Sequence, residues 1–148
     1  MTDAEANRGA SGPVAVPGPP EMLEIYRALP TLDEWFVEVL AFCANPPSEH
    51  ARAADWILDN DYQVKRALRR LTQELPQQFY DQLPALAGAK GAGTPRVFAI
   101  AQTALGQLES QITLASLAEF VRQHHNSAPL GNAELWAMPS MLRLACLE

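Results

Sequence analysis

The sequence predicts an all-α protein, an irregular bundle of about six helices that follows a disordered N-terminal tail. From Glu21 onward, apolar residues recur every three or four positions, which is the period of a helix with one buried face. No segment keeps the alternating pattern of a strand, and no Asn-Gly or Asp-Gly pair marks a hairpin. The chain has 148 residues, 48% of them hydrophobic, which suits one domain with a core of its own.

The first 20 residues differ in composition from the rest. They contain four prolines and three glycines among small polar residues. Such a segment cannot bury enough apolar surface to offset the loss of chain entropy on folding. We therefore expect a disordered tail over 1–20 and a helical domain over 21–148.

Prolines and capping residues predict the first helices. A short helix is expected over 21–29 because Pro30 lacks the backbone donor that would continue it. Thr31 and Glu34 have capping-box spacing and predict a second helix that ends near residue 44. We prefer one long helix over 49–75. A break at Asp59-Asn60-Asp61 is the alternative, since these residues favour turns and caps.

The second half of the chain predicts a short helical turn over 76–83, a glycine-rich loop over 85–93, and three further helices. These helices are expected to begin near Thr94-Pro95, Thr113 and Asn132. Pro139 should kink the last one. Its expected apolar side consists of Leu135, Met138, Leu142 and Ala145. This helix is still amphipathic at Glu148 and has no stop signal, so we expect the chain to be cut there.

The charge of the chain is uneven. The net charge is −6, with 11 acids and 3 bases in residues 1–62 and 6 acids and 8 bases in residues 63–148. A net negative charge argues against nucleic-acid binding, which requires clustered cations. The one basic cluster is Lys65, Arg66, Arg69 and Arg70. It is interpreted as a solvated helix face, and the alternative is a docking surface for an acidic partner or anionic lipid.

The sequence contains no convincing catalytic, cofactor-binding or metal-binding group. His124 and His125 are adjacent and would point in different directions on a helix, and His50 is isolated. The acids at 55, 59 and 61 are interpreted as solvent-facing partners of nearby bases rather than as acid–base catalysts. No nucleophile elbow, phosphate-binding glycine loop or Cys-x-x-Cys motif is present.

The tryptophans and cysteines are expected to be structural. Trp35, Trp56 and Trp136 lie within or beside apolar patterns, so a core role is preferred over a platform that stacks on sugar rings. Cys43 and Cys146 are expected to be buried thiols of a protein in the reducing cytoplasm, because no signal-peptide pattern is present. No run of about 20 apolar residues could span a membrane.

Four segments resemble a known family. They are Ala54-Asp-Trp-Ile-Leu-Asp-Asn-Asp-Tyr62, the stretch from Glu74-Leu-Pro through Phe79-Tyr80 to Leu83-Pro84, Pro95-Arg-Val-Phe-Ala-Ile-Ala101, and Glu134-Leu-Trp-Ala-Met-Pro-Ser-Met-Leu-Arg-Leu144. In this order they resemble the N-terminal, non-catalytic region of bacterial cyclic β-1,2-glucan synthases, which are of the glucan-synthase and glycobiose-phosphorylase kind. The resemblance covers about 48–148, roughly two thirds of the chain.

The chain departs from the family pattern in two places. Members commonly carry an aromatic residue where this chain has Asp61, which also interrupts the apolar seam. Before the fifth helix they commonly have a His-Thr-Asp-like turn, where this chain has Glu109-Ser-Gln-Ile-Thr113. The departures suggest a divergent member or a fragment under relaxed constraint.

The resemblance implies a role for the chain as part of a larger protein. The parent would transfer glucose from UDP-glucose and cyclise the product in the bacterial inner membrane. The chain itself would be a cytoplasmic helical accessory segment without catalytic activity or cofactor. It would dock onto downstream domains of the parent or another protein, or self-associate. The alternatives are a stand-alone protein-interaction adaptor and, ranked lower, a carbohydrate-binding module. The expected interaction surface comprises Lys65, Arg66, Arg69, Arg70, Leu135, Leu142 and Arg143.

Overall fold

A computed structural model describes residues 15–16, 18–87, 92–109 and 111–147. These residues form seven helices and one two-stranded sheet, which confirms the all-α prediction. The helices are α1 (Glu24–Cys43), α2 (Ala51–Asp59), α3 (Asp61–Glu74), α4 (Gln77–Tyr80), α5 (Arg96–Leu108), α6 (Leu114–Ser127) and α7 (Asn132–Leu147). The strands β1 (Ala15–Val16) and β2 (Ala85–Leu86) pair antiparallel.

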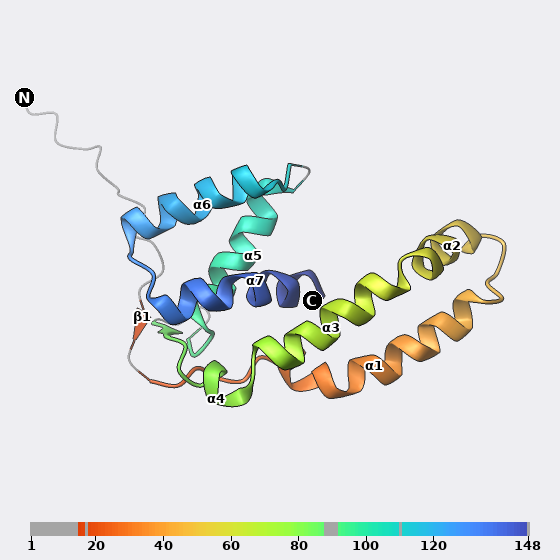
Figure 1. Ribbon diagram of the computed structural model, residues 1–148, viewed down its shortest axis with the longest axis horizontal. Coiled ribbons are helices and arrows are strands. Elements are labelled where there is room, and N and C mark those ends of the chain that lie inside the picture. Colours follow the sequence, from red (N-terminus) through yellow and green to blue (C-terminus); the bar gives the residue numbers. More distant parts are fainter. Residues whose placement is uncertain (1–14, 17, 88–91, 110, 148) are drawn as a thin grey trace, which may run out of the picture.

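The helices form an arm and a more compact part (Figure 1). In the arm, α1 and α3 lie side by side and α2 connects their distant ends. In the compact part, α5 and α7 make the most extensive contact between any two elements, and α6 packs on α5. The last helix also contacts α1 and α3, so α7 joins the two parts.

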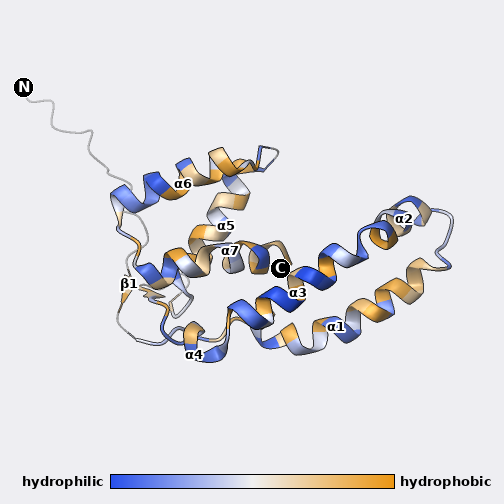
Figure 2. Ribbon diagram, in the orientation of Figure 1, coloured by the Kyte–Doolittle hydropathy of each residue, from blue (hydrophilic) through white to orange (hydrophobic). Residues whose placement is uncertain are grey.

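The main core lies where α3, α4, α5 and α7 meet. Its fully buried side chains are Leu71, Leu75, Tyr80, Leu83, Val97, Phe98, Ala101, Ala104, Ala137, Met141 and Leu144. Figure 2 shows that α3 is mainly hydrophilic, and only its Leu68 and Leu71 are buried. Phe36, Cys43 and Ala54 are also buried but do not belong to this core cluster.

Pro30 does not end the first helix, so the prediction of two helices separated there is wrong. It lies inside α1, which runs without interruption to Cys43. The Thr31 hydroxyl donates to the carbonyl oxygen of Ala28 at 2.8 Å and is therefore not an N-cap. An internal proline costs about 3 kcal/mol. Pro30 itself is exposed, while Leu29 and Phe36 are buried on either side of it.

The expected long helix over 49–75 is wrong, and the alternative break is correct. Asn60 separates α2 from α3 and caps both. Its side-chain amide donates to the carbonyl of Trp56 at 2.8 Å, and its own carbonyl accepts from the amide of Gln63. Asp61 starts the next helix and pairs with Lys65, which explains why a charge interrupts the apolar seam.

The expected disordered tail over 1–20 is tested only in part. Residues 1–14 and residue 17 lie outside the described residues. Ala15 and Val16, in contrast, form β1 and pair with Leu86 and Ala85. Part of the tail, and part of the expected loop over 85–93, is therefore ordered by long-range backbone pairing.

The start signals for the later helices are largely confirmed. Thr113 caps α6 in a capping box with Ser116, in which each side chain accepts from the other residue's amide. The last helix begins at Asn132, and its buried residues differ from those expected. Of the expected apolar side only Met138 is buried. Cys43 is a buried free thiol as expected, whereas Cys146 is exposed.

Candidate interaction site

Three of the four segments that carry the resemblance meet in the core. Arg96 of the third segment and Glu134 of the fourth form a buried ion pair, with 8% and 1% of their side chains exposed. Glu134 also accepts from the amide of Gly131 at 2.8 Å and so caps α7. Arg96 donates further to the carbonyl of Pro129. These residues join the start of α5 to the start of α7.

The second segment is tied to the fourth by Glu74. Its Oε2 atom accepts from the hydroxyl of Ser140 at 3.2 Å and from Nη1 of Arg143 at 2.5 Å. Burial disfavours the carboxylate, but these two donors outweigh that cost and lower the pKa of Glu74 below its ordinary value. The contact fixes the end of α3 against α7.

Tyr80 holds the chain that leads into α1. Its hydroxyl donates to the carbonyl of Glu21 at 2.9 Å and accepts from the amide of Leu23 at 3.0 Å. Its ring stacks on that of Tyr26, with the centroids 4.3 Å apart. Burial raises the pKa of Tyr80 to about 12. These contacts fix the chain before α1 against α4.

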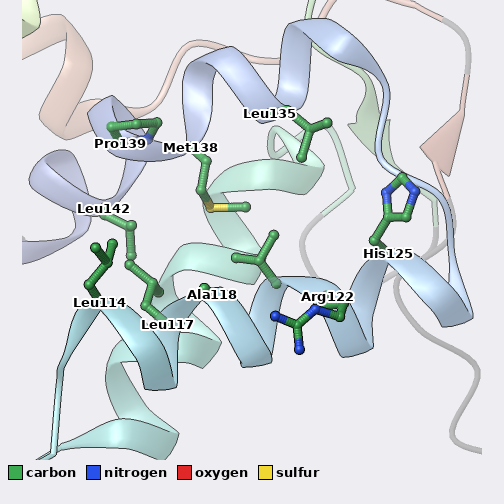
Figure 3. Close-up of a pocket in the computed structure, with 10 residues that line it drawn as sticks. Leu114, Leu117, Ala118, Arg122, His125, Leu135, Met138, Pro139 and Leu142 are labelled. Carbon is green, nitrogen blue, oxygen red and sulfur yellow. The ribbon is translucent and has the colours of Figure 1, made fainter.

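An apolar groove separates α6 from α7 and has a volume of about 620 Å³. In Figure 3, side chains from the two helices point toward each other across it. The lining residues are Leu114, Leu117, Ala118, Val121, Arg122, His125, Leu135, Met138, Pro139 and Leu142. Leu114 at its edge is 86% exposed. Exposed apolar surface that is continuous over two helices is typical of a site where another protein segment binds.

The expected interaction residues lie in three different places. Leu135 and Leu142 line the groove. Arg143 pairs with Glu74 outside it. The basic cluster lies on α3, where Lys65 pairs with Asp61. The pairing lowers the pKa of Asp61. The structure therefore does not bring the expected surface together.

The basic cluster also faces acids from another helix. Lys65 and Arg69 line a shallow depression opposite Asp33 and Glu34 of α1. The acid-rich first part of the chain therefore offsets part of the positive charge. Two residues of the basic cluster therefore have acidic neighbours on α1.

Residues of α6 were not included in the expected surface, although they form half of the groove. The groove residues of α6 recur every three or four positions, as expected for one face of a helix: Leu114, Leu117 and Val121. The buried residue of α6 is Phe120. The spacing indicated an apolar face but could not tell which part of it another helix covers. That distinction depends on how α6 packs on α5.

The tryptophans are exposed, so the prediction that they belong to the core is wrong. The exposed fractions are 58% for Trp35, 66% for Trp56 and 81% for Trp136. Each lies on a helix whose other faces supply the buried contacts. Trp136 lines a second depression, of about 660 Å³, together with Gln73, Glu74, Phe79 and Arg143.

The histidines do not form a metal site among the described residues. His124 stacks on Phe120, and Nδ1 of His125 accepts from the amide of Leu130 at 3.2 Å. Across the described ranges, no three residues of the His, Cys, Asp and Glu types lie close enough together to hold an ion. The described helices also include none with the length and apolarity to cross a bilayer.

Comparison with known proteins adds one relative. The chain is similar to part of a cyclic glucan synthase. It is 34% identical over 130 residues to the cyclic β-(1,2)-glucan synthase NdvB of Rhizobium meliloti (strain 1021). The match covers 86% of this chain, more than the two thirds expected from the four segments, but only 4% of the synthase.

No protein-family model matches the chain, and no solved structure matches it. The similarity to NdvB confirms a relationship to a segment of a synthase. Because the chain spans about 4% of that protein's length, the activity of the whole synthase is not transferred to this chain.

Proposed function

We propose that the chain is a helical docking segment of a cyclic β-1,2-glucan synthase-like glucosyltransferase and has no catalytic activity of its own. The observation that carries the proposal is the apolar groove between α6 and α7, within a chain that is similar over 86% of its length to a segment of NdvB. The groove presents leucines, a methionine and a proline, and few polar groups. Such a surface suits packing and not chemistry.

The proposed occupant is an amphipathic helix from the downstream part of the same protein. Leu117, Leu135 and Leu142 would receive its apolar side chains, as in other complexes of a helix with a groove. Arg122 and His125 would meet polar or acidic groups at one edge. We also propose that the segment lies on the cytoplasmic side of the inner membrane, which the resemblance implies.

A segment replacement tests this role. The matching segment of NdvB is replaced by this chain in Rhizobium meliloti, and cyclic β-1,2-glucan is measured in cell extracts. We expect the hybrid to make glucan and a deletion of the segment to make little. Leu117→Asp in the hybrid should reduce the yield, because a buried charge opposes docking. Ala115→Asp, outside the groove, is the matched control.

Two outcomes would contradict the proposal. The deletion could make as much glucan as the intact synthase, which would mean that the segment has no role in synthesis. The isolated chain could release UDP from UDP-glucose, which would show catalysis in these residues. Hybrid and deletion proteins must be present at equal amounts in the membrane, as measured by immunoblot.

A further inference from the structure

The depression around Trp136 differs in chemistry from the groove. It lies between the end of α3, α4 and the middle of α7, and it is lined by Gln73, Glu74, Pro76, Phe79, Trp136, Pro139 and Arg143. The indole of Trp136 is 81% exposed. The depression therefore combines an exposed indole with a carboxylate, a guanidinium and an amide.

The polar groups around the indole have hydrogen-bonding capacity to spare. Among the described residues, Glu74 uses Oε2 to accept from Ser140 and Arg143, while no group donates to its Oε1. Arg143 donates one hydrogen bond to Glu74, although a guanidinium carries five donors. Gln73 is exposed and adds an amide. The depression thus presents donors and acceptors next to an aromatic face.

We propose that this depression binds a glucosyl unit of a β-1,2-linked glucan. One face of a glucose ring carries axial C–H groups that pack on an indole. The equatorial hydroxyls point sideways, where a carboxylate oxygen and guanidinium N–H groups can bind them with charge-assisted hydrogen bonds. The contacts between Glu74, Ser140 and Arg143 hold the charged groups in place before a ligand arrives.

The choice of glucan rests on the proposed function, whereas the choice of a saccharide rests on the site. The α6–α7 groove lacks this mixture of groups, since its lining is almost entirely apolar. Trp35 and Trp56 are also exposed but do not line this depression, which makes them internal controls. If the tryptophans were buried in the core, as the sequence predicted, they could not bind a saccharide.

The test uses the full chain with one tryptophan as the reporter. Trp35→Phe/Trp56→Phe leaves only Trp136, and both replaced side chains are exposed, so the fold should be kept. Titration with a linear β-1,2-linked glucose trimer should give a saturable change in tryptophan emission. In the Trp136→Phe variant the emission comes from the other two indoles, and the trimer should not change it. Glycerol at equal concentration controls for solvent effects.

Calorimetry then measures affinity in matched variants. Trp136→Ala should weaken binding of the trimer at least about tenfold, and Trp56→Ala should leave it unchanged. Gln73→Ala should weaken it several-fold, with the exposed Gln78→Ala on α4 as its control. Absence of heat and of an emission change at millimolar trimer would overturn the inference. Equal binding by Trp136→Ala would also overturn it.

Failure here is distinguishable from failure of the proposed function. Glucan production by the NdvB hybrid measures the docking role, and it does not require the isolated chain to bind a saccharide. A productive hybrid combined with no binding of the trimer removes only the saccharide site. Binding of the trimer combined with full glucan production by the deletion protein removes only the docking role.

Discussion

Arg96 and Glu134 form a two-point ion pair between the first turn of α5 and the first turn of α7. Nε donates to Oε1 at 2.7 Å, and Nη2 donates to Oε2 at 2.5 Å. Both residues are buried, and none of the buried side-chain polar atoms in the described ranges is without a partner. Because the penalty of removing two charges from water offsets their attraction, the pair determines geometry more than it adds stability.

Breaking this pair should be costly. Glu134→Ala is expected to lower the free energy of unfolding by about 3–5 kcal/mol, because Arg96 would remain charged and buried without its partner. Urea unfolding followed by circular dichroism measures the change. The double variant Arg96→Met/Glu134→Leu should cost much less than the sum of the two single changes. A loss of under about 1 kcal/mol in Glu134→Ala would contradict this account.

Tyr80 should make the stability of the protein depend on pH in the alkaline range. Its pKa in the folded protein is about 12, above the ordinary value of 10. The stabilisation is therefore complete below pH 10 and is lost as pH rises toward 12, by about 2–3 kcal/mol. Urea unfolding at several pH values measures the slope.

The matched control is Tyr80→Phe. It removes the ionisable group, and with it most of this pH dependence. A smaller slope should remain, because burial also raises the pKa of Tyr26. At pH 7 the change should cost about 1–3 kcal/mol, since the amide of Leu23 loses its acceptor. An unchanged slope in Tyr80→Phe would assign the effect to other groups.

The exposed tryptophans should be nearly neutral to replacement. Trp35→Ala and Trp56→Ala are each expected to change the free energy of unfolding by less than about 1 kcal/mol, because more than half of each residue is exposed. Phe98→Ala, a core change of similar type, should cost about 3–5 kcal/mol. Chemical denaturation measures all three. A loss of about 3–5 kcal/mol for either tryptophan variant would instead support the prediction from the sequence that the tryptophans belong to the core.

The groove should cause the isolated chain to self-associate. Leu114, Leu135 and Leu142 contribute to an open apolar groove, and a second copy of the chain can cover such a surface. Sedimentation velocity at rising concentration should show species larger than the monomer. Leu135→Asp should shift the distribution toward monomer, whereas Ala115→Asp, which adds the same charge outside the groove, should not. A single monomeric species at high concentration would refute this prediction.

Local chemistry made some features predictable and left others open. The capping box at Thr113 and the break around Asn60 depend on side chains bonding to the backbone a few residues away, and such signals can be recognised in a sequence. Pro30 led to a wrong prediction of a helix end. Its cost of about 3 kcal/mol is smaller than the stabilisation gained by burying the residues on either side. When a local cost is only a few kcal/mol, tertiary contacts decide whether the helix continues.

The sequence by itself determined that the chain is helical, roughly where most helices begin, and that four segments resemble a glucan synthase region. These properties follow from the periodicity of apolar residues, from capping groups and from the order of the segments along the chain. Only the tertiary structure decided which apolar faces are covered. The last helix has apolar residues on more than one side, and its contacts with α5, α3 and α1 accompany the burial of Ala137, Met141 and Leu144, whereas Leu135 and Trp136 remain exposed. Burial depends on the neighbour that a face meets, and that neighbour is set by contacts between residues far apart in the chain.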